Sequence, residues 1–268
     1  MELVNQAQNY AWGRKSQNSL VYKLISHQEK QPQDQSQYYA ELWMGSHPKS
    51  PSSLILNQQG DKISLPEYLE SEGKALPFLF KVLSIRKCLS LQMHPNKKQA
   101  EHLHQEFPEI YKDDNHKPEM CIALEDDFIC FGNFTKVENV AMNLKRYSSL
   151  LNNLGSFIKR LERLVESQET NGETQELLYK DLIDFSTTLE PSVTTEIKNE
   201  IEKIPETERT FRDQITLEVI NQFPGDTGVI VTLLMNLLKL KKGEAFLMQP
   251  NEPHAYFSGE CIEGKFKF

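Results

Sequence analysis

The segment LSLQMHPNK, residues 89–97, places two polar side chains, Gln92 and His94, two positions apart between apolar residues. Side chains alternate between the faces of a β-strand, so on a strand these two point to the same side and Met93 to the other. If that side is the interior of a barrel, a buried amide and a buried imidazole both need partners. A metal ion is one such partner, and further ligands would then come from elsewhere in the chain.

Three residues outside this segment are candidates for those further ligands. They are His116 and Glu119 in NHKPEM (115–120) and His254 in PNEPHAY (250–256). Pro253 restricts the backbone directly before His254, which suits a ligand held in a fixed position.

A single histidine is also often a hydrogen-bonded core or surface residue. This is our interpretation of His27, His47, His102 and His104. His102 and His104 lie two apart in a predicted helix, where side chains at that spacing do not face each other and cannot share an ion.

The composition is that of a globular chain. It has 268 residues, 38% hydrophobic and 25% charged, with a net charge of -8. Binding to nucleic acid or to an anionic membrane is not expected, because each requires a basic surface. The four cysteines form no C-x-x-C pair and are interpreted as reduced thiols of a cytoplasmic protein. Neither a signal-peptide pattern nor an apolar stretch of membrane-spanning length is found.

Residues 1–134 have the pattern of a β domain. LPFLFKVLSI (76–85) and CLSLQMHP (88–95) are predicted as two buried strands, and CIALEDDFICFG (121–132) as another strand pair. Short helices are predicted over 65–73 and 96–107.

Residues 135–223 change to a helical pattern, with few Gly and Pro and with apolar residues recurring at three and four. We predict five helices, the first begun by a capping box of Thr135 and Glu138 and the fourth capped by Ser192. This block carries no chemical motif, so we interpret it as structural or as a lid beside a site.

The helices end at Pro224-Gly225-Asp226. Residues 229–248 are then predicted as two strands, a tight turn at Lys242-Gly243 and a third strand. The predicted architecture is therefore mainly β: one β domain (1–134 and 224–268) carrying an all-α insertion (135–223).

Six segments resemble the type I mannose-6-phosphate isomerase (phosphomannose isomerase) family, from the N-terminus to about Glu263. They are YAELWMGSHPKSPS (39–52), LPFLFKVLS (76–84), LSLQMHPNKKQAEHLH (89–104), NHKPEM (115–120), FPGDTG (223–228) and PNEPHAY (250–256). QxHPNK followed by HKPE is more specific than general cupin sequence. The resemblance implies a cupin-type (jelly-roll) β-barrel with a helical insertion.

The resemblance also implies one Zn²⁺ per chain, held by the residues that match the family's ligands: Gln92, His94, Glu119 and His254. Two imidazoles, a carboxylate and an amide oxygen suit Zn²⁺, with a position left for water or substrate. The implied activity interconverts mannose 6-phosphate and fructose 6-phosphate and feeds GDP-mannose synthesis. A cation near the reacting oxygens stabilises the enediolate charge, and a general acid/base moves the proton.

Other residues match pocket positions of the family. Glu263 matches an acid near the metal and, with Lys117, is a candidate catalytic residue. The candidate substrate-binding residues are Trp12, Glu41, Lys81 and Ser90. Lysines in such a pocket would bind phosphate or sugar oxygens. The alternative for each lysine is a structural salt bridge, and Glu41 could be buried by pairing with one of them.

The chain departs from the family after Glu263. There the family continues into a segment containing SDNVVRAGLTPK, whose arginine is regarded as important for catalysis, and then into a second cupin-like domain. This chain instead reads GKFKF. We therefore expect a C-terminally truncated chain with weak or absent isomerase activity, because loss of one positioned cation can cost orders of magnitude in rate.

Two other functions stay open. His94, Glu119 and His254 are also the two-histidine, one-carboxylate set of non-haem Fe(II) oxygenases, although Gln92 would take a further position. The second alternative is a catalytically silent short form that binds zinc and sugar phosphate. The expected partner is a small-molecule sugar phosphate, and the expected state is a cytoplasmic monomer.

Overall fold

The structure, a computed structural model, describes residues 2–30, 32–57, 59–167 and 172–266, without the side chains of residues 172, 173 and 175. Its contacts divide the chain into two compact units, residues 1–130 with 238–268 and residues 131–237. Residues in helices outnumber those in strands over the described ranges. The fold class of the whole chain is therefore mixed α and β, and the prediction of a mainly β chain fits only the first unit.

The first unit combines strands with short helices. Its strands are β1 (Glu2–Val4), β2 (Gln6–Gln8), β3 (Arg14–Lys15), β4 (Tyr38–Tyr39), β5 (Glu41–Met44), β6 (Ser53–Ile55), β7 (Lys62–Ser64), β8 (Phe78–Ile85), β9 (Glu119–Ala123), β12 (Ala245–Met248) and β13 (His254–Phe266). Its helices are η1 (Ser16–Asn18), α1 (Leu20–Gln28), α2 (Leu65–Ser71) and α3 (Lys97–Glu106). β10 (Phe128–Phe134) and β11 (Met235–Leu240) carry the chain out of this unit and back.

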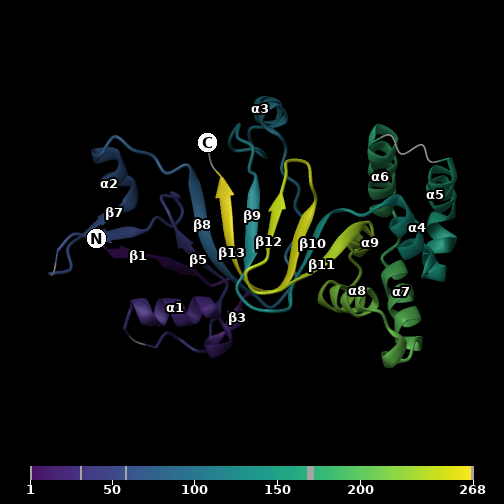
Figure 1. Cartoon of the computed structure of the whole chain (residues 1–268), viewed down its shortest axis with the longest axis horizontal. Coiled ribbons are helices and arrows are strands. Elements are labelled where there is room, and N and C mark those ends of the chain that lie inside the picture. Colours follow the sequence, from purple (N-terminus) through teal and green to yellow (C-terminus); the bar gives the residue numbers. More distant parts are fainter. Residues whose placement is uncertain (1, 31, 58, 168–171, 267–268) are drawn as a thin grey trace. The chain divides into compact units, whose positions relative to one another are not determined.

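The largest sheet is organised around β13. Its strand order is β11-β10-β13-β8-β5-β2, and β9 pairs with both β13 and β12. β13 is antiparallel to β8 and to β9, and Figure 1 shows β8, β13, β9 and β12 as successive neighbours. The predicted strands in 76–85 and 121–132 are confirmed as β8, β9 and β10, and the predicted short helices as α2 and α3. The predicted pairing within 121–132 is wrong, because β9 pairs with β12 and β13, and β10 with β11 and β13.

Segment 88–95 is not a regular strand, contrary to the prediction. The Leu89 amide donates to the Tyr256 carbonyl at 2.9 Å, and the Gln92 amide donates to the His254 carbonyl at 2.9 Å. From Leu89 to Gln92 the chain advances three residues, whereas its partner β13 advances two, from His254 to Tyr256. Such an extra residue on one strand is characteristic of a β-bulge, which interrupts the ladder. Gln92 and His254 remain as an isolated bridge.

Helix α1 covers one face of the large sheet. Val21 and Tyr22 of α1 pack with Leu42 of β5 and Val82 of β8 in a buried cluster. Side chains alternate along a strand, so the odd-numbered neighbours Leu83 of β8 and Cys261 of β13 lie on the opposite face. These two belong to a second buried cluster, which also holds Cys121, Ala123 and Met248.

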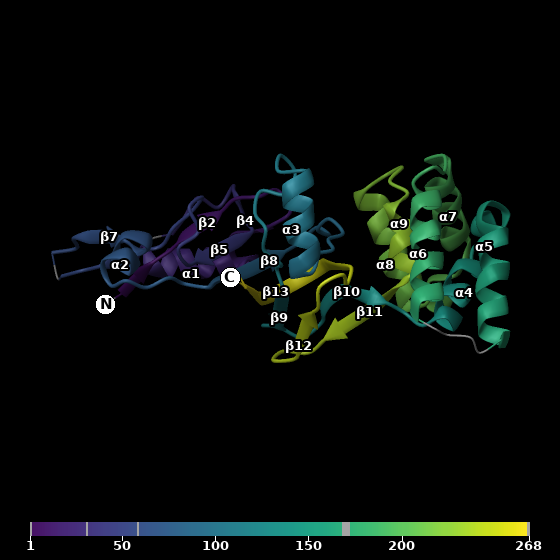
Figure 2. The ribbon, with the colours of Figure 1, turned by 90° about the horizontal axis from the view of Figure 1, so that it is seen from above.

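The second unit is a group of helices that Figure 2 shows side by side. They are α4 (Val137–Lys145), α5 (Ser148–Ser167), α6 (Gly172–Ser186), α7 (Ser192–Lys203), η2 (Glu206–Glu208), α8 (Phe211–Gln222) and α9 (Gly228–Leu233). The five predicted helices are confirmed as α4 to α8. Their apolar stripes are buried, as at Leu144, Leu154, Leu161 and Ile197. No helix within the described ranges is both long and apolar enough to cross a membrane.

Residues 229–233 form a helix and not the predicted strand. The β-branched run Val229, Ile230, Val231 and Thr232 favours a strand by local preference. All four side chains are buried in α9, so packing on every side decides the conformation. The predicted turn at Lys242-Gly243 is confirmed, and Gly243 has the positive φ of 87° that favours glycine.

The two predicted helix caps are displaced. Helix α4 follows Lys136 at the cap position, and the Thr135 hydroxyl accepts a hydrogen bond from Asn139 Nδ2 at 3.1 Å instead of closing a capping box. Ser192 is the first residue of α7, and Pro191 takes the cap position before it.

A fully buried carboxylate, Asp213 of α8, ties helices of the second unit together. It accepts hydrogen bonds from Arg146 Nε at 2.5 Å, from the Tyr147 hydroxyl at 2.9 Å and from the Thr210 amide at 2.8 Å. Burial alone would raise the pKa of Asp213, but the hydrogen bonds from Arg146 and Thr210 outweigh it and lower the pKa from the ordinary 3.8.

Asp213→Ala is expected to lower the free energy of unfolding by about 3 kcal/mol, because it leaves Arg146 and the buried Tyr147 hydroxyl without their acceptor. Asp181→Ala is the control, since the exposed Arg160–Asp181 pair at 3.4 Å should contribute less than about 1 kcal/mol. Urea unfolding at pH 7 measures both, and equal small effects would contradict the assignment.

The lowered pKa of Asp213 also predicts a pH dependence. A carboxylate whose folded pKa is depressed contributes stability above its unfolded pKa, near 3.8, and that contribution is lost as pH falls towards the folded pKa. Unfolding measured below pH 4 should therefore show a smaller loss of stability in Asp213→Asn than in the unchanged chain.

Candidate metal centre

His94, Glu119 and His254 meet in the first unit although they are distant in sequence. Glu119 begins β9, His254 begins β13, and His94 lies before α3. One donor atom of each lies within 4.8 Å of the others. Glu119 Oε1 is 3.1 Å from His94 Nε2, and Glu119 Oε2 is 3.3 Å from His254 Nε2. Two ligands at about 2.05 Å from a tetrahedral ion are about 3.3 Å apart, so the spacing suits one metal ion.

The chemistry of these donors also suits a cation. Glu119 and His254 are 2% and 4% exposed, and His254 Nε2 is buried without a hydrogen bond. The other ring nitrogen, Nδ1, lies 3.2 Å from the Glu252 carbonyl oxygen, a contact that orients the ring so that Nε2 faces Glu119. A buried carboxylate with an imidazole nitrogen facing each of its oxygens is a set of donors that suits a metal cation.

Gln92 is held beside this group through its backbone. The Gln92 backbone amide donates a hydrogen bond to the His254 carbonyl, and the His254 backbone amide donates one to the Gln92 carbonyl at 2.8 Å. The Gln92 side chain is half-buried, and its role as a fourth ligand stays a prediction. His116, the other histidine considered, is not part of the group of donors.

Lys265 reaches the same donors, although it was not among the site residues predicted from the sequence. The register of β13 and β9 sets Lys265 opposite Glu119. Its ammonium forms an ion pair with Glu119 Oε1 and lies 3.4 Å from His94 Nε2. The sequence did contain a signal for Lys265: it lies two residues after Glu263, and side chains at that spacing point to the same face of a strand.

The groups around Glu119 lower its pKa more than burial raises it. Burial alone would raise the pKa of Glu119, but the neighbouring His254 and His94 imidazoles and the Lys265 ammonium hold it well below the ordinary value. Glu119 is therefore a carboxylate at neutral pH and is ready to bind a cation.

A second ionic group lies on the same face of the sheet. Lys81 Nζ is 3.0 Å from Glu263 Oε2 and 3.3 Å from Glu41 Oε2, and all three side chains are largely buried. The ammonium also lies 5.2 Å from the centre of the Trp43 ring. Burial would lower the pKa of Lys81, but the two carboxylates outweigh it and raise the pKa. Lys81 and Glu41 thus form an ion pair, and their roles in substrate binding stay predictions.

Strand register explains why the two groups are neighbours. Lys265 faces Glu119 in one row across the sheet, and Glu263 faces Lys81 and Cys121 in the next. Successive rows on one face are about 6.6 Å apart, twice the rise per residue of a strand. The chemistry-bearing residues therefore occupy adjacent rows of a single face.

The remaining predicted site residues have other contacts. Lys117 forms an ion pair with Asp113 at 2.9 Å and is half-buried. Trp12 is half-buried, stacks on Tyr10 with ring centres 5.9 Å apart, and packs against the buried cluster that contains Leu83. Ser90 is exposed. None of these contacts involves the donors of the metal group.

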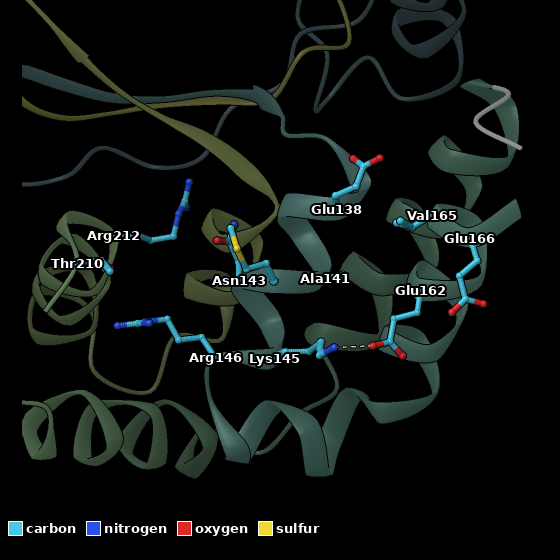
Figure 3. Close-up of a pocket in the computed structure, with 11 residues that line it drawn as sticks. Glu138, Ala141, Asn143, Lys145, Arg146, Glu162, Val165, Glu166, Thr210 and Arg212 are labelled. Carbon is cyan, nitrogen blue, oxygen red and sulfur yellow. Dashed lines mark hydrogen bonds and ion pairs between the residues drawn. The ribbon is translucent and has the colours of Figure 1, made fainter. Parts of the chain in front are cut away.

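The second unit has a hollow of about 750 Å³, lined by residues of α4, α5 and α8 (Figure 3). Lys145 pairs with Glu162 at 2.6 Å, as the dashed line in Figure 3 marks, and Arg146 pairs with Asp213. Arg212 donates to the Thr232 carbonyl at 3.0 Å. These three cations are already engaged, so we assign no site to this hollow.

Comparison with known proteins supports the family resemblance. A family model described as "Phosphomannose isomerase type I, catalytic domain" matches residues 1–137, about half of the chain. Mannose-6-phosphate isomerase of Schizosaccharomyces pombe is 38% identical in an alignment that covers 95% of this chain and 64% of that protein. Mannose-6-phosphate isomerase 1 of Arabidopsis thaliana is 34% identical, over 95% of this chain and 62% of that protein. The chain thus spans less than two thirds of these relatives.

Solved structures agree with this similarity. A mutant of phosphomannose isomerase from Salmonella typhimurium superposes with a TM-score of 0.75 at 28% identity, over 99% of this chain and 67% of that one. A mannose 6-phosphate isomerase bound with zinc and yttrium gives a TM-score of 0.74 at 27% identity, over 98% and 67%. The non-haem iron alternative gains no support from these matches.

Lys81→Met is expected to lower the free energy of unfolding by about 3 kcal/mol, because Glu41 and Glu263 then stay buried without their shared cation. Replacing both acids by Gln in the Lys81→Met background should restore part of the loss. Urea unfolding at neutral pH measures each variant. A Lys81→Met chain as stable as the parent would show that the ion pairs contribute nothing.

Proposed function

Because the chain belongs to the type I phosphomannose isomerase family, we propose that it is a zinc-dependent aldose–ketose isomerase. Its proposed substrates are mannose 6-phosphate and fructose 6-phosphate, within GDP-mannose synthesis. The observation that carries the proposal is the buried Glu119 carboxylate set between two imidazoles, 3.1 and 3.3 Å away, with His254 Nε2 making no hydrogen bond within the part of the chain that the structure describes.

One Zn²⁺ per chain would be held by His94, Glu119 and His254, with Gln92 as the fourth ligand. When bound, the ion would stabilise negative charge on the sugar oxygens at C1 and C2. Two nitrogen donors and one or two oxygen donors, at the spacing observed, favour zinc over Mg²⁺ or Ca²⁺, which prefer oxygen ligands alone.

The chain's own residues would position the sugar and move its proton. Isomerisation takes the proton from C2 of the open-chain aldose and returns one to C1, while the hydroxyl proton passes from O2 to O1. Glu263 is our first candidate for the carbon-bound proton, because it lies in the row next to Glu119, and Lys81 at 3.0 Å fixes its carboxylate. Lys117 is the second candidate.

The proposed substrate-binding residues are Trp12, Glu41, Lys81 and Ser90. Glu41 and Lys81 are already joined in one ion-pair group beside the metal ligands, so their polar atoms could turn to sugar hydroxyls or phosphate without leaving the sheet face. Trp12 would supply an apolar wall, since it packs against the buried cluster beneath.

We also propose the domain limits, the oligomeric state and the cellular location of the chain. We assign the first unit to a cupin-type β-barrel domain (1–134 and 224–268) and the helices to an inserted domain (135–223). The contact-based division at 131–237 supports an insertion with slightly wider limits. A cytoplasmic monomer that binds no nucleic acid is in keeping with the net charge of -8 and with four buried cysteines that form no disulfide.

Metal analysis of the purified chain tests the ligand set. One zinc per chain should remain after dialysis against metal-free buffer, and His254→Ala and Glu119→Gln should each lose it. His102→Ala is the matched control, because His102 lies exposed on α3 and pairs with Glu106 at 3.7 Å. Zinc retained equally by all four proteins would remove these residues from the site.

A coupled assay for mannose 6-phosphate formed from fructose 6-phosphate tests the activity. Turnover should disappear on chelation, return with zinc, and fall by about two orders of magnitude or more in Glu263→Gln, since that change removes the proton carrier. We expect this turnover to be weak; zinc bound at one per chain with no turnover would favour the silent zinc-binding alternative, and turnover comparable to that of a full-length relative would overturn the expected impairment.

A further inference from the structure

The ammonium of Lys265 occupies the same donors that a metal ion would need. It pairs with Glu119 Oε1 and lies 3.4 Å from His94 Nε2, which are two of the atoms proposed to bind zinc. His94 Nε2 can accept a hydrogen bond from an ammonium only through its lone pair, and a metal would take that same lone pair. The two cations therefore exclude each other at these atoms.

We propose that Lys265 is an internal competitor for the metal, so that a divalent cation binds only when the lysine side chain leaves the group. The inference rests on the ligand set of the proposed function. In the metal-free chain the ammonium neutralises the buried Glu119. When the metal binds, the ammonium moves away, because a divalent ion and an ammonium within a few ångströms repel each other strongly in a partly buried place.

Two features of the fold suit this exchange. The lysine backbone is fixed, since β13 pairs Lys265 with Leu79 of β8 and with Glu119 of β9. Its side chain is 24% exposed, against 3% for that of Glu119, so the flexible stem has a route to solvent that leaves the strand intact. Lys265 thus sets the metal affinity of the site without being a ligand.

The geometry also separates Lys265 from the second ionic group. Glu263, two residues earlier on the same face, already pairs with Lys81 at 3.0 Å. Lys265 is consequently the cation of the metal row, and Lys81 is the cation of the neighbouring row. Removing Lys265 should change zinc binding and leave the Lys81 group in place.

Zinc affinity of the full chain, measured by competition with a chromogenic chelator, tests the proposal. Lys265→Met keeps the length of the stem and removes the charge, and it should bind zinc at least about tenfold more tightly than the parent. Lys265→Arg keeps the charge and should stay near the parent. Lys74→Met, which removes an exposed cation of the same unit, is the control and should not change the affinity.

Thermal unfolding gives a second measurement, in which Lys265→Met should lower the stability of the metal-free chain although it strengthens zinc binding. Without metal, Lys265→Met should melt below the parent, because Glu119 loses its counter-ion; zinc should then raise its melting temperature by more than it raises that of the parent. If Lys265→Met does not fold, Lys265→Gln replaces it.

The outcomes are distinguishable. Equal or weaker zinc affinity in Lys265→Met, with zinc bound by the parent, overturns the competition and leaves the metal site standing. Absence of zinc binding in both proteins overturns the ligand set itself and the competition with it.

Discussion

The buried carboxylate of Glu119 imposes the constraint on which the first unit depends. A carboxylate that is 2% exposed is stable only with positive charge at hand. The fold supplies two imidazoles and one ammonium, from β13, the loop before α3 and the end of β13. This concentration of groups has no purpose in an ordinary core, where apolar residues of similar volume would serve as well.

Strand β13 places the residues around Glu119 in ordered rows on one face of the large sheet. Its register sets an apolar row at Leu83 and Cys261, an ionic row at Lys81 and Glu263, and the metal row at Glu119 and Lys265. The side-chain period of a strand is two, so a slip of one residue would exchange this face for the one that packs on α1. The hydrophobic cluster under α1 and the chemistry on the other face are therefore fixed by the same pairing.

Much of this could be predicted from the sequence. The helical block was visible because apolar residues recur at three and four, and the three donors of the metal group were named from short polar motifs flanked by apolar strands. The family resemblance supplied what spacing alone could not, namely that His94, Glu119 and His254 belong together. Strands β9 and β10 were evident from their two apolar runs, although each pairs with β13 and not with the other.

Other features depend on tertiary contacts that local patterns do not report. The run 229–232 prefers a strand by composition but is buried on all sides as α9. Segment 88–95 has a strand pattern but meets β13 with a bulge, a mismatch that only the partner strand reveals. Lys265 lies beyond the segments that resemble the family, and its place opposite Glu119 follows from strand register alone.

X-ray absorption spectroscopy at the zinc edge of the reconstituted chain examines the centre most directly. Nitrogen and oxygen donors at about 2.0–2.1 Å, with the outer-shell scattering of two imidazoles, are the predicted result. Sulfur scattering at about 2.3 Å, or a shell of oxygen donors without imidazole, would show that the ion binds elsewhere and that Glu119 and its two histidines are not the metal centre.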